Sequence, residues 1–329
     1  MSEPYSSEHS HRARNMHAAL LGTVPMIRAD DLMADDHPVR RFDGARRIRS
    51  SALLRALVFI CIMTFVSGLT VGLARSNSME TASFGELVGA VAAYLIVVLV
   101  MEERRAPVEL APSRAFDLIR GMAASFACIA ICIGIVALLG GYRIVGFDPG
   151  YSPWSDLLVL GFTAGIAEEI MMRGMLLRLV EESLGSWGAV VVSALVFGLV
   201  HIANPDGTLW GGMAIAIEAG LLFGAIYLAT RSLWWCIGFH FMWNIAEGPV
   251  FGSIVSGTGA RRSWLVAQWQ GPDLLTGGAF GLEASIVPVV LLGSLAIATL
   301  VHLQRLGRMI EPVWIRRKRL GNDRSAQSV

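Results

Sequence analysis

Charged residues are scarce in this chain. They make up 16% of its 329 residues, whereas a soluble domain of this length would be about a quarter charged. Hydrophobic residues reach 54%, and the mean hydropathy is +0.57. Lysine occurs once, as Lys318, and the formal net charge is only +1, so the chain lacks the basic surplus of a nucleic-acid-binding protein. These shortages indicate a membrane protein.

Cysteine is also rare. The four cysteines all fall in apolar stretches, and no two of them form a CxxC pair; they are Cys61, Cys128, Cys132 and Cys236. A disulfide framework or a thiolate zinc site is therefore not expected. Small apolar fillers between helices are the simpler interpretation of these residues.

Eight apolar runs are long enough to cross a bilayer, which takes roughly 20 residues of helix. They lie near 53–74, 82–101, 118–140, 155–180, 186–203, 208–230, 232–249 and 282–303. The sequence therefore predicts an all-α polytopic membrane protein, a bundle of about eight transmembrane helices. The first three runs and the last are apolar apart from charges near their ends, whereas the fourth, sixth and seventh carry ionisable groups. We expect those three inside the bundle.

Arginine clusters predict the orientation, since basic loops stay in the cytoplasm. One cluster precedes the first run, one follows the second run and one lies in the C-terminal tail. Their residues are Arg40, Arg41, Arg46, Arg47, Arg49, Arg104, Arg105, Arg114, Arg316, Arg317, Lys318 and Arg319. Both termini are therefore expected in the cytoplasm, although Arg261 and Arg262 depart from the rule. The predicted organisation is a polar tail over 1–50, a transmembrane bundle over 51–304 and a basic tail over 305–329.

The N-terminal tail lacks the short apolar core of a cleavable signal peptide. The basic C-terminal tail is suited to contact anionic lipid headgroups. The abundance of arginine and the short tails are typical of a bacterial protein, so we expect the inner membrane of a bacterium.

The fourth run carries Glu168, Glu169 and Arg173. A charge near the centre of a bilayer costs roughly 2.5–3.5 kcal/mol on insertion scales, so such groups face partners or a cavity. Glu169 and Arg173 are four residues apart on one helix face and can form a pair. Glu168 is turned about 100° from Glu169, so it faces a different neighbour.

Two later runs add further polar groups. His240, Asn244 and Glu247 share a face of the seventh run by their i, i+4 and i+7 spacing. His201 lies near one end of the fifth run. Because Glu168 and His240 fall near mid-span by simple counting, the depth of a shared site stays open.

These groups could form a hydrolytic site. A buried glutamate can take a proton from water near neutral pH, and an asparagine can donate to the oxyanion of a tetrahedral intermediate. Two histidines can bind a divalent metal, or hydrogen-bond instead. No serine or cysteine lies beside them as a nucleophile, so water activation is the expected chemistry.

Each group alone also has a purely structural interpretation. Glu169 with Arg173 could be a structural ion pair, and His201 or His240 could be an interior histidine with satisfied hydrogen bonds. Glu218 could partner a polar neighbour. Glu247 could orient His240 or Asn244, or reach the membrane interface, so the roles of these two glutamates stay open.

The ordered motifs Glu-Glu-xxx-Arg, Phe-xxx-His and His-xxx-Asn, each on an apolar helix, closely resemble the CAAX prenyl endopeptidase and bacteriocin-processing family of intramembrane proteases, also called the CPBP or Abi family. The match covers about 155–248. The resemblance implies that Glu168 is the general base, with Glu169 and Arg173 in support. It also implies that His201 and His240 line the catalytic water and that Asn244 supports the oxyanion.

The family resemblance leaves the cofactor open between glutamate-activated water and a divalent metal such as zinc. If a metal is bound, the candidate ligands are Glu168, His201 and His240. The implied substrates are membrane-anchored peptides or proteins in the lipid bilayer, with no nucleic acid partner.

Two other functions compete with an intramembrane endopeptidase. A non-catalytic scaffold or bacteriocin-immunity protein could retain the motifs as a packing core, and it would tolerate Glu168→Gln. A transporter could use the acidic groups and histidines as a relay, but it predicts inverted repeats, which the sequence does not show.

Overall fold

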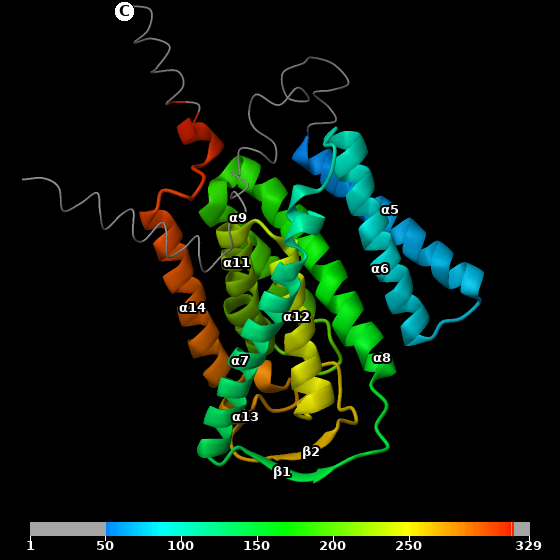
Figure 1. Cartoon of the computed structure of the whole chain (residues 1–329), viewed down its shortest axis with the longest axis vertical. Coiled ribbons are helices and arrows are strands. Elements are labelled where there is room, and N and C mark those ends of the chain that lie inside the picture. The colour runs from blue at the N-terminus through cyan, green and yellow to red at the C-terminus, as the bar shows by residue number, and fades with distance from the viewer. Residues whose placement is uncertain (1–50, 317, 319–329) are drawn as a thin grey trace, which may run out of the picture.

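The apolar runs form helices that pass up and down a single bundle (Figure 1). The computed structural model describes residues 51–316 and 318, so the predicted N-terminal tail, 1–50, and residues 317 and 319–329 of the C-terminal tail lie outside the described residues. The helices are α5 (Ala52–Ala74), α6 (Met79–Ile96), η1 (Val97–Met101), η2 (Val108–Leu110), η3 (Pro112–Arg114), α7 (Phe116–Leu138), α8 (Trp154–Asp156), η4 (Leu157–Glu168), η5 (Ile170–Leu177), α9 (Arg178–His201), α10 (Leu209–Ile215), η6 (Ala216–Leu221), α11 (Leu222–Thr230), α12 (Leu233–Ile245), η7 (Ala246–Val250), α13 (Asp273–Thr276), η8 (Leu282–Ala284) and α14 (Ile286–Arg305).

The prediction of an all-α polytopic membrane protein is confirmed. Within the described part of the chain, six helices are long and apolar enough to cross a membrane. The fourth and fifth predicted spans belong to one of them, Trp154–His201, which is interrupted at Gly185, where φ is 71°. The seventh predicted span is present as α12 with η7, but it is not among the six.

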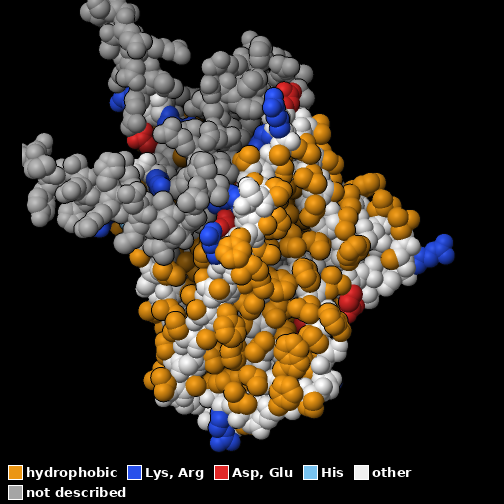
Figure 2. Space-filling model, in the orientation of Figure 1, with side chains coloured by type: hydrophobic (Ala, Val, Ile, Leu, Met, Phe, Trp, Pro, Cys, Tyr) orange, Lys and Arg blue, Asp and Glu red, His pale blue; other side chains and the backbone are white. Residues whose placement is uncertain are grey.

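The helices differ in how much of their surface is buried inside the protein, and this distinguishes inner helices from outer ones. In the Leu209–Thr230 helix, 72% of the most apolar stretch is buried inside the protein, against 6% in α5. Figure 2 shows hydrophobic side chains over the flank of the bundle and charged ones gathered mainly near its ends. This distribution suits a lipid-facing flank between two polar surfaces.

A small antiparallel sheet, which the sequence did not predict, closes the end of the bundle opposite the start of α5 (Figure 1). It pairs β1 (Tyr142–Phe147) with β2 (Leu265–Trp269). The Tyr142 hydroxyl donates to the carbonyl of Phe251 at 3.1 Å, which ties the sheet to the segment after η7. The long connection between η7 and β2, residues 251–264, is therefore ordered, and we call it the cover.

Glycines permit close contact around α12. A Cβ on Gly165 of η4 would lie 3.1 Å from the Cα of Phe241, and one on Gly238 would overlap the carbonyl of Leu118 in α7. Gly220 faces Ala194 in the same way, since a Cβ there would lie 2.7 Å from the Cα of Ala194. The small residues let α12 approach η4 and α7 closely.

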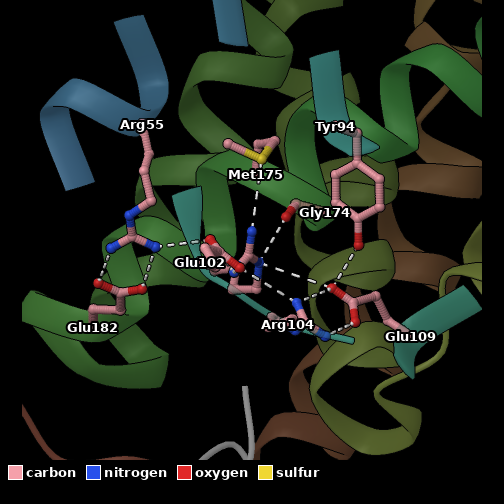
Figure 3. Close-up of polar contacts among 9 residues, drawn as sticks. Arg55, Tyr94, Glu102, Arg104, Glu109, Gly174, Met175 and Glu182 are labelled. Atoms are coloured by element: carbon pink, nitrogen blue, oxygen red, sulfur yellow. Dashed lines mark hydrogen bonds and ion pairs between the residues drawn. The ribbon is translucent and has the colours of Figure 1, made fainter. Parts of the chain in front are cut away.

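A buried ion network joins α5 and α6 to α9 (Figure 3). Arg55 donates to Glu102 at 2.9 Å and pairs with Glu182 at 2.6 Å. Arg178 of α9 pairs with the same Glu102 at 2.6 Å. Arg104 also lies 3.5 Å from Glu102. Since Glu102 has no exposed surface, its three arginine partners offset the cost of burying its charge.

Glu109, in the short connection between α6 and α7, continues the network. It accepts hydrogen bonds from Arg104 and from the Tyr94 hydroxyl, the latter at 2.5 Å. Burial alone would raise the pKa of Glu109, but the neighbouring Arg104 and Arg178 guanidinium groups lower it to about 2. The ionised carboxylate is thus strongly favoured in the folded protein.

Because of Glu109, the stability of the protein against unfolding should decrease at low pH. Its pKa is depressed below the ordinary 4.5, so its stabilising contribution is complete above about pH 4.5 and is lost as the pH falls toward 2. We expect Glu109→Gln to lower the unfolding temperature at pH 7 and to weaken its further decline below pH 4.5. Asp148→Asn, which removes the partner of exposed Arg262, should keep the wild-type dependence; equal profiles for wild type and Glu109→Gln would contradict the prediction.

Gly238→Ala should destabilise the bundle by about 1–3 kcal/mol, because the new methyl group has no space against α7. Gly134→Ala is the matched control, since nothing lies within 4 Å of a Cβ at that position. Thermal unfolding in detergent measures both. A Gly238→Ala protein as stable as the control would show that the two helices separate at little cost.

Candidate active site

Glu168 is the last residue of the π-helical segment η4, and Glu169 follows it directly. The two side chains face different surroundings. The Glu168 side chain is 26% exposed, whereas Glu169 has no exposed surface. The prediction that these neighbours point to different groups is confirmed. One carboxylate is therefore accessible from a cavity, and the other is fully enclosed by protein.

Glu169 accepts from two partners through the same oxygen. Arg173 Nη1 donates to Oε1 at 2.8 Å, which confirms the predicted i, i+4 pair. His240 Nδ1 lies 2.9 Å from the same atom, a contact that the sequence did not predict. Because a carboxylate only accepts, Nδ1 carries the hydrogen, and Glu169 fixes the orientation of the imidazole.

Arg173 has several partners besides Glu169, although its Nε has no hydrogen-bond partner among the described residues. It donates to the carbonyls of Ala219 and Gly220, each at 3.2 Å. Its guanidinium carbon lies 4.9 Å from the ring centres of both Phe197 and Phe223. These cation–π contacts and hydrogen bonds hold the cation beside Glu169 and away from the cavity.

The two histidines present their Nε2 atoms to the site. His240 Nε2 lies 4.0 Å from Glu168 Oε2. His201 Nδ1 donates to the carbonyl of Phe197 at 2.7 Å, since a carbonyl only accepts, and this leaves its Nε2 free. Each imidazole is thus oriented by a contact on its far side.

Asn244 is oriented as well. Its Nδ2 donates to the carbonyl of Leu160 at 2.9 Å, which fixes the direction of the carboxamide. The amide group has a second N–H. That hydrogen is available for the oxyanion role that the family resemblance implies.

One cavity of about 390 Å³ brings the predicted site residues together. Glu168, His201, His240 and Asn244 all line it. The other lining residues come from α6, η4, η5, α9 and the segment after η7: Ser83, Glu86, Val159, Leu160, Thr163, Ala164, Met171, Met172, Phe197, Val200, Asn204, Val255, Ser256 and Thr258. The geometry unites the four residues, while their catalytic roles stay predictions.

The segment after η7 covers the end of α9, where His201 lies. This places His201 inside the protein, although it is the last residue of its helix. Asn204, just after α9, donates to the carbonyl of Ser256 at 2.6 Å, and the backbone of Asp206 bonds that of Gly257 at 2.9 Å. The end of α9 is therefore covered by protein, and His201 is only 9% exposed. The fifth predicted helix therefore ends against the segment that follows η7.

Helix α6 supplies two lining residues, Ser83 and Glu86, which sequence reasoning missed. The expectation that the second span is apolar apart from its ends, and only packs around the site, is wrong in this respect. The signal was available, because Glu86 stands five residues inside the predicted span 82–101. A carboxylate at that depth calls for a partner or a cavity, as Glu168 does.

A second, smaller void of about 10 Å³ lies behind the histidines and is lined by Glu218, Glu283 and Ser256, among others. Ser256 donates to Glu283 through its backbone N–H at 2.7 Å and its hydroxyl at 2.6 Å. Neither oxygen of Glu218 has a hydrogen-bond partner among the described residues. The void has room for about one water molecule.

Among the described residues, Glu247 makes no hydrogen bond to His240. Its carboxylate accepts from the Ser253 hydroxyl at 3.1 Å, and the residue has no exposed surface. This contact favours a part in holding the cover after η7 over the suggested orientation of His240.

The fit of a metal depends on Glu168, His201 and His240. Their free Oε2 and Nε2 atoms have the donor chemistry of a zinc site. Among the described residues, however, no group of three His, Cys, Asp or Glu side chains is arranged to hold an ion.

Residues 150–246 match the family model described as type II CAAX prenyl endopeptidase Rce1-like. The resemblance to the CAAX prenyl endopeptidase family is confirmed. The Rce1-like segment contains all six predicted site and supporting residues, whereas α5, α6, α7 and α14 lie outside it. No curated protein and no solved structure matches the chain.

Arg173→Ala should harm folding as well as activity. Its loss leaves Glu169 buried with only His240, at a cost of roughly 3–5 kcal/mol for a broken buried pair. We expect reduced yield and a lower unfolding temperature. Arg262→Ala, which removes an exposed pair, should cost about 1 kcal/mol or less. Normal yield and stability with lost activity would instead give Arg173 a direct catalytic part.

Proposed function

We propose that this protein is an intramembrane endopeptidase that hydrolyses peptide bonds of membrane-associated proteins or peptides through glutamate-activated water. The family match supports a CAAX-type intramembrane protease at the level of the family. The observation that carries the mechanism is the convergence of Glu168, His201, His240 and Asn244 on one cavity.

Glu168 is the proposed base, because its carboxylate is the accessible member of the acidic pair. It takes a proton from water as the water oxygen attacks the carbonyl carbon of the substrate. The carbonyl π bond opens, and its electron pair moves to the oxygen. The second N–H of Asn244 is suited to donate to that oxyanion.

Collapse of the tetrahedral intermediate reforms the carbonyl and breaks the C–N bond. The proton held by Glu168 passes to the departing amine, so the carboxylate is regenerated. His240 keeps its Nε2 directed at Glu168 because Glu169 holds its Nδ1. Glu169 and Arg173 are therefore positioning residues in this mechanism.

The proposed setting is the inner membrane of a bacterium, with both termini in the cytoplasm. Figure 1 supports equivalent positions for the two ends, since α5 begins and α14 ends at the same end of the bundle. The proposed protease core is 155–248 within a bundle of 51–304, and the proposed partners are membrane-anchored substrates and the lipid bilayer.

Glu168→Gln tests the proposal. With a membrane-anchored peptide library and purified protein, we expect the variant to lose about 10²- to 10⁴-fold in rate, the usual contribution of a general base. Glu80→Gln, which alters an exposed carboxylate on α6, should keep the wild-type rate. Adding a chelator to the wild type then separates glutamate-activated water from a metal-dependent reaction.

The same experiment tests the scaffold alternative. Equal cleavage by wild type and Glu168→Gln would disprove the assigned base. A Glu168→Gln protein that folds normally and keeps its biological effect would favour a non-catalytic scaffold or immunity protein.

A further inference from the structure

Both formally charged side chains that line the 390 Å³ cavity are carboxylates. Glu86 of α6 and Glu168 of η4 line it, and none of the described residues around it is lysine or arginine. Apart from His201 and His240, the lining therefore has no basic side chain to set against the two carboxylates. The imidazole of His240 lies 4.0 Å from Glu168, and no basic side chain pairs with Glu86.

Glu86 differs from most buried acids of this protein in having no cationic partner. Glu169 pairs with Arg173, and Glu181 pairs with Arg231 at 2.5 Å. Glu86 is half-buried, and its side chain makes no hydrogen bond or ion pair with another described residue. Unlike Glu169 and Glu181, it has no arginine beside it, and a carboxylate of this kind in a cavity is suited to receive a cation from outside.

The cavity wall combines this charge with apolar surface. Val159, Met171 and Val200 line it together with Glu86. Its volume lies within the roughly 300–1,000 Å³ of ordinary ligand sites. The shape and chemistry thus suit a side chain with an apolar stem and a cationic end, which describes arginine and lysine.

We propose that Glu86 is a specificity residue that binds a basic side chain of the substrate, so that the protein selects apolar, membrane-anchored peptides with arginine or lysine near the bond to be cleaved. The inference rests on the proposed function, because it assigns the substrate class of that site. A guanidinium can donate two parallel hydrogen bonds to one carboxylate, so arginine is the better-bound of the two.

Binding tests the proposal without requiring cleavage. The probes are detergent-solubilised peptides with one apolar anchor, in which arginine is scanned through consecutive positions after the anchor, each paired with its neutral isostere citrulline. In the Glu168→Gln background, we expect the arginine peptide to bind about tenfold more tightly at one or two positions. Adding Glu86→Gln should bring that ratio close to one.

Glu80→Gln is the matched control, because it removes a carboxylate from the same helix outside the cavity. It should leave the arginine preference unchanged. Glu86→Ala provides a second variant if Glu86→Gln folds poorly. A ratio near one at every position, no binding of either peptide, or a preference that survives both Glu86 variants would overturn the proposal.

Hydrolysis by the wild type separates this inference from the proposed function. An arginine preference that depends on Glu86, without any cleavage, supports the binding site and contradicts the endopeptidase. Cleavage of arginine and citrulline peptides at equal rates and with equal affinity supports the endopeptidase and overturns the role of Glu86.

Discussion

The arrangement of the site depends on one buried carboxylate. Glu169 has no exposed surface, and a single oxygen of it contacts both Arg173 and the imidazole of His240. An ionised group in such surroundings is stable only with partners of good geometry. These contacts join η4 and η5 to α12, and Arg173 extends the linkage through carbonyls of the Leu209–Thr230 helix. The same interactions that stabilise the bundle thus orient the proposed catalytic histidine.

Two groups of acids in this protein have different consequences. Glu102, Glu109, Glu169 and Glu181 are held by arginine, and they link helices or the connections between them. Glu86 and Glu168 face the cavity without an arginine or lysine partner. Paired charges give rigidity, whereas unpaired ones retain the capacity to take a proton or a ligand. Pairing with arginine thus distinguishes the acids that link helices from the two acids that line the cavity.

Much of the architecture could be predicted from the sequence, because hydrophobic length and helical spacing are local properties. They gave the transmembrane class, the Glu169–Arg173 pair and the four residues that meet at the cavity. The contact of His240 with Glu169 and the pairing of β1 with β2 depend on how separate segments meet, which spacing within one helix cannot show. Glu86 is a different case. The sequence shows a charged residue inside a predicted span, but it does not show that the side chain faces the cavity.

The pairing of β1 with β2 also bears on biosynthesis. The two strands are separated in the sequence by most of the helices that form the site. The cover over the end of α9 can therefore close only after α12 and the following connection have left the ribosome and entered the membrane. Until then, His201 lacks its enclosure and the cavity lacks one wall. A nascent chain thus contains the polar side chains of the cavity before the cavity itself is complete.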